Sequence, residues 1–169
     1  MKTLKERWAG LWTRMGCKTG AERQFKGLLN RYAEPGRAHH TISHIESSLD
    51  ELEAVRSICC NPDAVEAAIW YHDAIYDSKA NNNELQSAHL FRVDAAEILN
   101  YRNYAFIGGV NRMIIATRHL RTKEADPDTL LLLDIDPLTL QRARLLLHGT
   151  VDVRASTFQH PCFDPGEGQ

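Results

Sequence analysis

Histidine and aspartate side chains, which bind divalent metals and transfer protons, gather in three short segments of this chain. The residues concerned are His40, His44, His72, Asp73, Asp134 and Asp136. None of the three segments contains a cysteine, and mixed imidazole and carboxylate ligands suit Mn²⁺, Fe²⁺, Zn²⁺ or Mg²⁺. The residue types therefore indicate a site for a divalent metal ion, without deciding which metal it takes.

Helical spacing is expected to bring these side chains together. His40 and His44 are four residues apart, so on one helix both imidazoles project from the same face and can address one metal. His72 and Asp73 flank the apolar stripe of their predicted helix, which makes both half-buried. A buried carboxylate without a partner is destabilising, so Asp73 needs a cation, an arginine or hydrogen-bond donors. A metal would satisfy Asp73 and the nearby imidazoles together.

The elements that must position these residues are predicted to be helices, because apolar residues recur at helical spacing almost throughout. Strand-like alternation is nearly absent, so the fold class is predicted to be all-α. We expect helices over residues 4–15, 25–32, 38–60, 62–76, 84–99, 104–117, from 127 onward and again from 137. The predicted N-caps are Asn61, Asn83 and Asp126. The tryptophans Trp8, Trp12 and Trp70 are expected in the core.

Length and patterning favour one domain. A chain of 169 residues with 43% apolar residues can bury a proper core but not two. We expect a single helical domain over residues 1–148 and an irregular tail over residues 149–169, where regularly spaced apolar residues are few. The abrupt loss of periodicity suggests truncation or a shifted reading frame, which sequencing the genomic locus would test. A short C-terminus would leave a helix face exposed and so favour a homo-oligomer.

Charge and cysteine content restrict the expected setting. The net charge is -2 and the pI is near 6.4, so we expect neither a nucleic-acid polymer nor an anionic membrane as partner. The four cysteines have no C-x-x-C spacing and the N-terminus has no apolar leader, which indicates a reducing cytoplasm. Apolar runs such as residues 130–133 are far shorter than the roughly 20 residues that span a bilayer. A soluble, cytoplasmic protein is expected.

The order of the histidine and aspartate segments, H…HD…D on successive helices, resembles the HD superfamily of metal-dependent phosphohydrolases. The likeness is closest to a bacterial branch of HD phosphohydrolases and runs over about residues 25–140. The segments that carry it are Arg31-Tyr32, Glu34-Pro35-Gly36-Arg37, His40-Thr41, His44-Ile45, His72-Asp73-Ala74-Ile75-Tyr76, Asn83-Glu84 and Ser87-Ala88. The resemblance implies an HD-domain-like helical bundle.

Carried over residue by residue, the resemblance implies a set of metal ligands. His44, His72 and Asp73 match three of them, and the last ligand is Asp134 or Asp136. Asp136 precedes a proline and is suited to capping a following helix, which slightly favours Asp134 as the ligand. Both aspartates remain candidates at this point.

The implied activity is hydrolysis of a phosphate ester, from a nucleotide or another small phosphorylated metabolite, by water that the metal activates. His40 resembles the first histidine of the H-x-x-x-H pair in cyclic-nucleotide phosphodiesterases, which serves as general acid toward the leaving oxygen. The candidate catalytic residues are then His40, Asp73 and Arg37. Arg37, Lys79 and His119 are candidates for substrate binding, since cationic side chains bind phosphoryl oxygens.

One departure from related proteins motivates an alternative. Nucleotide-hydrolysing relatives often carry a glutamate three residues after the HD aspartate, whereas this chain has Tyr76 there. The alternative hypothesis is a non-catalytic or degenerate HD-fold protein with a structural metal or a ligand-binding role. A substrate-dependent rate that Asp73→Ala abolishes would separate the two hypotheses.

Overall fold

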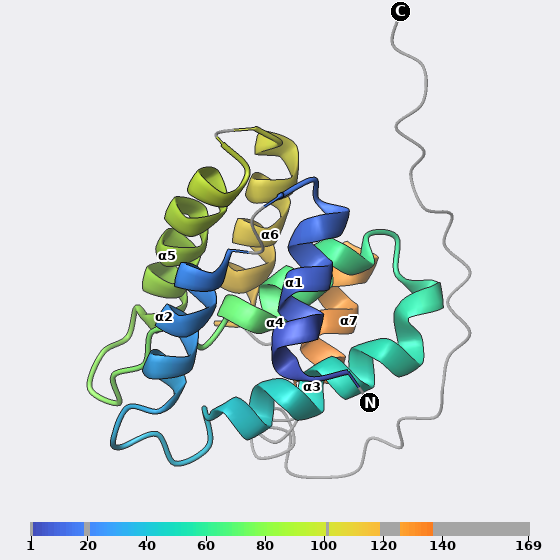
Figure 1. Ribbon diagram of the computed structural model, residues 1–169. Coiled ribbons are helices and arrows are strands. Elements are labelled where there is room, and N and C mark those ends of the chain that lie inside the picture. The colour runs from blue at the N-terminus through green and yellow to red at the C-terminus, as the bar shows by residue number, and fades with distance from the viewer. Residues whose placement is uncertain (1, 19–20, 101, 119–125, 137–169) are drawn as a thin grey trace, which may run out of the picture.

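The computed structural model describes residues 2–18, 21–100, 102–118 and 126–136 (Figure 1). Within these ranges the chain is all-α, as predicted, and contains no strand. The helices are α1 (Leu4–Arg14), α2 (Glu22–Tyr32), α3 (Ile42–Val55), the 3₁₀ helix η1 (Arg56–Ile58), α4 (Pro62–Tyr71), α5 (Asn83–Ile98), α6 (Tyr104–Ala116) and α7 (Pro127–Ile135). The predicted helix from residue 137 and the predicted tail over residues 149–169 lie outside the described residues.

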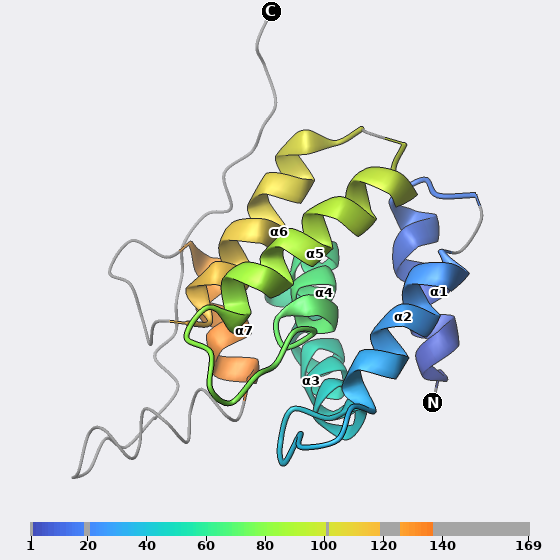
Figure 2. The ribbon, with the colours of Figure 1, turned by 90° about the vertical axis from the view of Figure 1, so that its left-hand side faces the viewer.

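Helix α4 runs through the middle of the molecule, and the other helices pack around it (Figures 1 and 2). It contacts α1, α3, α5, α6 and α7. Helices α5 and α6 lie side by side in both views, and α2 packs against α1. Helices α3 and α7 also contact each other, so residues at the end of α4 can meet side chains from both.

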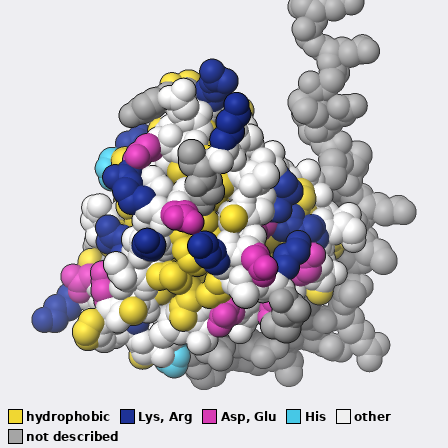
Figure 3. Space-filling model, viewed as in Figure 1, with side chains coloured by type: hydrophobic (Ala, Val, Ile, Leu, Met, Phe, Trp, Pro, Cys, Tyr) yellow, Lys and Arg dark blue, Asp and Glu magenta, His cyan; other side chains and the backbone are white. Residues whose placement is uncertain are grey.

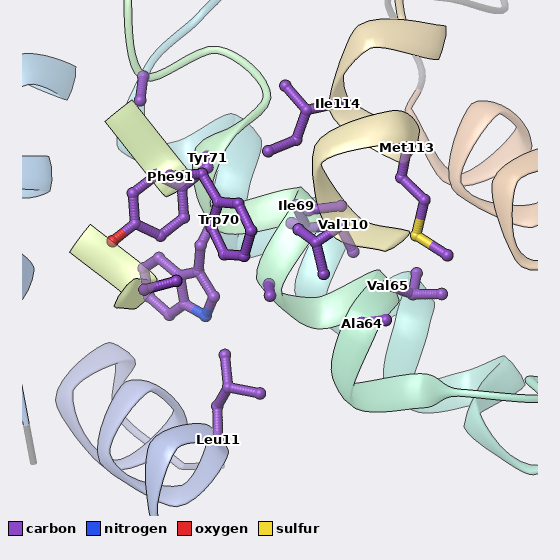
Figure 4. Packing of buried hydrophobic residues seen from close by; sticks show 14 of the residues in the cluster. Leu11, Ala64, Val65, Ile69, Trp70, Tyr71, Phe91, Val110, Met113 and Ile114 are labelled. Atoms are coloured by element: carbon purple, nitrogen blue, oxygen red, sulfur yellow. The ribbon is translucent and has the colours of Figure 1, made fainter. Parts of the chain in front are cut away.

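The amino-acid sequence of α4 explains its central position. Every residue over 64–71 is buried, and a helix that is apolar around its whole circumference belongs in a core. Figure 4 shows Ile69 of α4 beside Val110 of α6 within this core. The one charged residue in the buried stretch, Glu66, pairs with two arginines from neighbouring segments. Helix α4 is therefore held on all sides, which fixes the position of its C-terminal end.

Three tryptophans form an aromatic centre between α1 and α4. Trp8 packs edge-on against Trp12 and Trp70, with ring centroids 5.5 and 5.3 Å away. Aromatic pairs prefer this geometry. All three side chains are at most 1% exposed, which confirms the prediction that they belong to the core. The Trp8 indole N–H also donates to the carbonyl of Ala21, so the connection between α1 and α2 is tied to this centre.

The predicted N-caps of α4 and α7 are confirmed. The Asn61 side chain accepts a hydrogen bond from the Ala64 N–H, and Asp126 accepts one from the Thr129 N–H. Each of these helices then has proline in its first turn, where the missing N–H has no intrahelical partner in any case. Both helix starts therefore follow directly from local side-chain chemistry.

The start of α5 differs by one residue from the prediction. Its N-cap is Asn82, whereas Asn83 was predicted. The amide of Asn83 instead pairs with the backbone of Asp77, accepting from its N–H at 3.1 Å and donating to its carbonyl at 2.9 Å. Asn83 therefore holds the loop that follows α4.

Two predicted helix boundaries are wrong, and both lie at residues that could carry chemistry. Helix α3 begins at Ile42 rather than near residue 38, so His40 lies in the bent segment before the helix. Helix α4 ends at Tyr71 rather than near residue 76, so His72 is its C-cap and Asp73 follows in a turn. The carbonyls of residues 40, 73 and 74, which lie in the two non-helical segments, accept hydrogen bonds from one arginine side chain.

The face of the molecule that includes α1 carries charges of both signs (Figure 3). In Figure 3, Lys and Arg side chains are interspersed with Asp and Glu around an apolar area, so this face has no large patch of one charge. Among the described helices, none is both long enough and apolar enough to cross a membrane.

Candidate metal centre

Three residues that are far apart in the chain place possible ligand atoms around one point. His44 lies in the first turn of α3, His72 caps the C-terminus of α4, and Asp136 caps the C-terminus of α7. One nitrogen or oxygen from each lies within 4.8 Å of the others. All three residues are buried, with exposed fractions of 8%, 2% and 5%. This buried group can hold a metal ion.

The spacing of the atoms fits a single ion. His44 Nε2 lies 3.2 Å from His72 Nε2 and 3.5 Å from Asp136 Oδ1. Ligands about 2.1 Å from a tetrahedral metal lie roughly 3.4 Å from one another. Two imidazoles and a carboxylate suit first-row divalent metals, in agreement with the ligand chemistry expected from the sequence. The geometry and the donor types therefore agree.

Asp73 borders this group from the turn after α4. Its Oδ2 lies 3.1 Å from His72 Nε2 and 3.5 Å from His44 Nε2. The same oxygen lies 2.6 Å from His40 Nδ1. The side chains of Asp73 and His40 are 16% and 11% exposed, so they form the more open side of the site. Asp73 is close enough to serve as a further ligand.

His40 reaches the site by a route that the sequence did not predict. Helical spacing predicted that His40 and His44 share one face of a helix, and this is wrong because His40 precedes α3. The bent segment nevertheless turns the His40 ring toward the site, with its centroid 6.4 Å from that of His44. The Tyr76 ring packs against the His40 ring, with the two centroids 4.4 Å apart. A loop and an aromatic contact, rather than a helix face, position His40.

The orientation of the His72 ring favours metal binding. Its Nδ1 lies 3.0 Å from the carbonyl oxygen of Ile69, in the last turn of α4. Because a carbonyl oxygen only accepts, Nδ1 must carry the proton and donate it. The neutral ring then has its lone pair on Nε2, which faces His44 and Asp73. Histidines that bind metals are commonly fixed in this way.

The two buried histidines have opposite pKa shifts. Burial and the neighbouring His72 lower the pKa of His44 to about 4. Burial also opposes the charge on His72, but the attraction of Asp73 outweighs it, and the pKa of His72 rises to about 9. Burial likewise opposes the charge on Asp73, yet His72 and His40 hold its pKa well below the usual value. Without a metal, His72 therefore carries the positive charge that the carboxylates attract.

The helices add to this attraction for a cation. His72 and Asp136 stand at the C-terminal ends of α4 and α7, where helix dipoles and unpaired carbonyl groups produce negative potential. His44 comes from an N-terminal first turn, where the potential is positive, which agrees with its preference for the neutral form. Two of the three contributing helix ends therefore favour a bound cation.

The structure separates the two aspartates that the sequence left open. Asp136 is buried and belongs to the ligand group, whereas Asp134 is exposed on α7. The sequence favoured Asp134 because Asp136 precedes a proline, but the C-cap position of Asp136 leaves its side chain directed inward. The predicted substrate-binding residue Lys79 is exposed in the loop after the His72–Asp73 turn. The other predicted substrate contact, His119, lies outside the described residues.

Arg37, predicted to act on the substrate, is buried beside the site. Its side chain is only 2% exposed. One terminal nitrogen donates to the carbonyls of Asp73 and His40, and the other donates to the carbonyl of Ala74 and to the Glu34 carboxylate. Its terminal nitrogens therefore already have acceptors, and binding of phosphoryl oxygens by Arg37 stays a prediction.

Two aromatic residues near the site were not assigned a role from the sequence. Tyr32 and Tyr76 both face the Arg37 guanidinium, with ring centroids 5.3 and 5.8 Å from its central carbon. The resemblance noted in the sequence led to the expectation of a glutamate at the position of Tyr76, and this departure was the one available signal. It showed that the position was unusual but not that the ring contacts His40 and Arg37.

Comparison of the chain with protein-family models, with curated proteins and with solved structures finds no match in any of the three. The assignment of a function therefore depends on the residues of the site and on their arrangement.

Proposed function

We propose that this chain is a metal-dependent phosphohydrolase of the HD type, acting on a nucleotide or another small phosphorylated metabolite. The observation that carries the proposal is the convergence of His44, His72 and Asp136 with Asp73 beside them. These residues come from three segments, in the order in which HD proteins carry their ligands. Their agreement in type, order and spacing is difficult to explain by packing alone.

In this proposal the most buried residues bind the metal ion, and the more exposed side of the site faces the substrate. His44, His72 and Asp136 would hold the ion, with Asp73 as the further ligand. A divalent ion in such a site lowers the pKa of water and polarises a phosphoryl oxygen. His40 has Nδ1 bound to Asp73, which leaves Nε2 as the atom that would give a proton to the leaving oxygen. Asp73 would keep the His40 ring oriented during that transfer.

One observation favours a second candidate, a structural metal without turnover. The three residues of the ligand group are at most 8% exposed, and closed ligand sets are typical of structural sites. The exposed fractions of Asp73 and His40 give the site its more open side, which is the reason we prefer the enzyme. Bound metal without hydrolysis of any phosphate ester would favour the structural role.

The test compares two aspartates of the same helix. Wild type, Asp136→Ala and Asp134→Ala are purified without chelator, and metal per chain is measured by elemental analysis. Asp136→Ala should lose the metal because it removes a buried ligand, whereas Asp134→Ala should retain it because that side chain is exposed. Release of phosphate from nucleotides, and of nitrophenol from mono- and bis-nitrophenyl phosphate, then measures hydrolysis.

The two measurements separate the outcomes. Metal and hydrolysis that are both retained in Asp134→Ala and lost in Asp136→Ala would support the proposed enzyme. Wild type that takes up no metal even in excess Mn²⁺, or hydrolysis equal in wild type and Asp136→Ala, would refute it.

A further inference from the structure

A buried guanidinium lies directly beneath the turn that carries His72 and Asp73. Arg37 donates to the Asp73 carbonyl at 2.7 Å and to the Ala74 carbonyl at 2.9 Å, across 36 and 37 residues of sequence. It also donates to the carbonyl of His40 at 3.3 Å. A single side chain thus joins the backbone of the two segments whose side chains meet in the His40–Asp73 hydrogen bond.

The carbonyls that Arg37 contacts need a partner. Helix α4 ends at Tyr71, and the last carbonyls of a helix have no N–H partner within it. Backbone N–H groups of His72 and Ala74 continue only to Ala68 and Tyr71. The carbonyls of Ile69 and Trp70 are paired with the His72 ring and the Tyr32 hydroxyl. Arg37 donates instead to the carbonyls of Asp73 and Ala74 just beyond the helix, and it adds a positive charge near the negative end of the helix dipole. It therefore holds the turn that follows α4 from a distant segment.

Aromatic rings and an acid hold the guanidinium in place. Tyr32 and Tyr76 face it at 5.3 and 5.8 Å, and Tyr32 also donates through its hydroxyl to the carbonyl of Trp70 in α4. The exposed Glu34 pairs with one terminal nitrogen at 3.2 Å. A planar fork that binds several carbonyls and faces aromatic rings is a task for arginine, which a lysine ammonium does not reproduce.

We propose that Arg37 is a positioning residue of the metal centre, which sets the place of Asp73 and His40 by holding the backbone of the turn after α4 against the segment before α3. This inference rests on the proposed function, because it assumes that the site binds a metal ion. Arg37 acts through other residues, since its nitrogens contact carbonyls and Glu34 rather than the ligand group. Asp73 is the most sensitive residue because its carboxylate contacts three imidazoles while Arg37 holds its carbonyl.

The test compares Arg37→Lys with Arg56→Lys. Arg56 is also an arginine paired with an acid, and its side chain is 28% exposed, but it lies twelve residues after His44, roughly 18 Å along the helix direction. Metal-free proteins are titrated with Co²⁺, and its visible absorption spectrum reports ligand geometry. Arg37→Lys should bind Co²⁺ about 10–100-fold more weakly, because the loss of a group that orients metal ligands usually has an effect of this size. The absorption spectrum of its bound Co²⁺ should also change. Arg56→Lys should match wild type in both affinity and spectrum.

A milder variant covers the case in which Arg37→Lys does not fold. The Glu34 side chain is 49% exposed, so Glu34→Ala should fold and weaken Co²⁺ binding by roughly twofold to fivefold. Wild-type Co²⁺ affinity in folded Arg37→Lys would overturn the inference, as would equal weakening in Arg37→Lys and Arg56→Lys, which would indicate general destabilisation. If Arg37→Lys is unfolded, wild-type affinity in Glu34→Ala would overturn it.

A metal-free measurement separates this inference from the proposed function. If wild type does not bind Co²⁺ at all, the proposed function fails, and the inference is then judged by NMR of the metal-free proteins. Arg37→Lys should shift the imidazole signals of His40 and His72 and the amides of residues 73–75, and leave those of α1 unchanged. Imidazole signals identical to wild type would overturn the positioning role.

Discussion

Two clusters of buried charge lie toward opposite ends of α4, and they are balanced by different chemistry. The histidine cluster at the C-terminal end consists of His40, His44, His72, Asp73 and Asp136. The arginine cluster at the N-terminal end consists of Arg14, Arg56, Asp63 and Glu66. Both contain carboxylates that water reaches poorly, so both need positive charge.

In the arginine cluster that charge is permanent. Arg14 donates to Asp63 at 2.7 Å and to Glu66 at 2.6 Å, and Arg56 pairs with the same two acids. Guanidinium groups do not lose their proton at any ordinary pH. Their planar donors are matched to carboxylates, so this cluster is complete with amino acids alone and suits a structural role.

In the histidine cluster the charge can be exchanged. His72 carries it because the attraction of Asp73 outweighs burial, and an imidazole can release its proton within the range in which proteins work. Once His72 is neutral, its Nε2 and that of His44 both offer lone pairs at 3.2 Å from each other. The comparison teaches that a buried acid paired with histidine leaves room for a metal, whereas one paired with arginine does not.

The largest expected effect is stabilisation by metal at the histidine cluster alone. At a free metal concentration 1,000 times the Kd, binding should stabilise the protein by about 4 kcal/mol, or raise Tm by roughly 10 °C. His72→Gln should abolish this increment, because it removes a buried ligand. Arg56→Gln should lower the starting Tm and keep the increment. Differential scanning calorimetry with and without Mn²⁺ measures both, and a full increment in His72→Gln would contradict the site.

The second effect is a pH dependence of metal affinity. In the metal-free protein the pKa of His72 is raised to about 9 and that of His44 is lowered to about 4. Between pH 6 and 8 an ion must therefore displace one proton, from His72, so affinity should rise with pH. The expected increase is about tenfold per pH unit, or roughly 100-fold over this range.

Isothermal titration in buffers of different ionisation enthalpy checks this directly. The measurement should show about one proton released per ion at pH 7. An affinity that does not change from pH 6 to 8 would mean that His72 is already neutral in the metal-free protein. No proton would then have to leave His72 when the metal binds.

Much of the fold was predictable because it follows from local chemistry. The apolar periodicity identified the helices, and the Asn61 and Asp126 caps identified the starts of α4 and α7. The burial of Trp8, Trp12 and Trp70 follows from their places in the helical pattern. These features depend on residues within one or two helical turns, which sequence patterns report well.

The features that were missed depend on distant residues. Helix α4 was expected to continue to about residue 76, but the chain turns after Tyr71, and Arg37, more than thirty residues earlier, binds the carbonyls of Asp73 and Ala74 in that turn. The contacts of Arg37 with this backbone could not be expected from the sequence, which indicated only a cationic side chain suited to phosphoryl oxygens. His40 and His44 were correctly associated, but for the wrong reason, since a loop brings them together.

The choice between the two aspartates shows the same limit. Asp134 and Asp136 differ by two positions at the end of one helix, and local rules treat a residue before proline as a cap. The structure places Asp136 inward because α7 packs against both α3 and α4, which bear His44 and His72. Packing between helices, which one segment of sequence does not encode, decides which oxygen reaches the site.

The smallest expected effect belongs to the arginine cluster. Burial raises the pKa of Glu66 despite its two arginines, so the folded chain holds the ionised carboxylate less favourably than the unfolded chain does. That contribution to stability is present at low pH and is lost as pH rises through the folded-state pKa. At pH 7, Glu66→Gln removes the penalty of burying the ionised carboxylate, but it also weakens two charge-assisted hydrogen bonds, and the arginine side chains, 40% and 28% exposed, can turn to water. The net loss should be about 1 kcal/mol.

Urea unfolding of the metal-free proteins at pH 7 measures this loss, with Glu46→Gln on the exposed side of α3 as the matched control. The control should change stability by less than about 0.5 kcal/mol. Co²⁺ affinity should be the same in Glu66→Gln as in wild type, since the two clusters lie toward opposite ends of α4. A loss of stability above about 3 kcal/mol would show that the two arginines cannot be solvated once the Glu66 carboxylate is removed, so that their charges are left buried and unpaired. A change in Co²⁺ affinity would instead show that the two clusters are coupled through α4, and the contrast between a closed structural cluster and an exchangeable metal site would no longer hold.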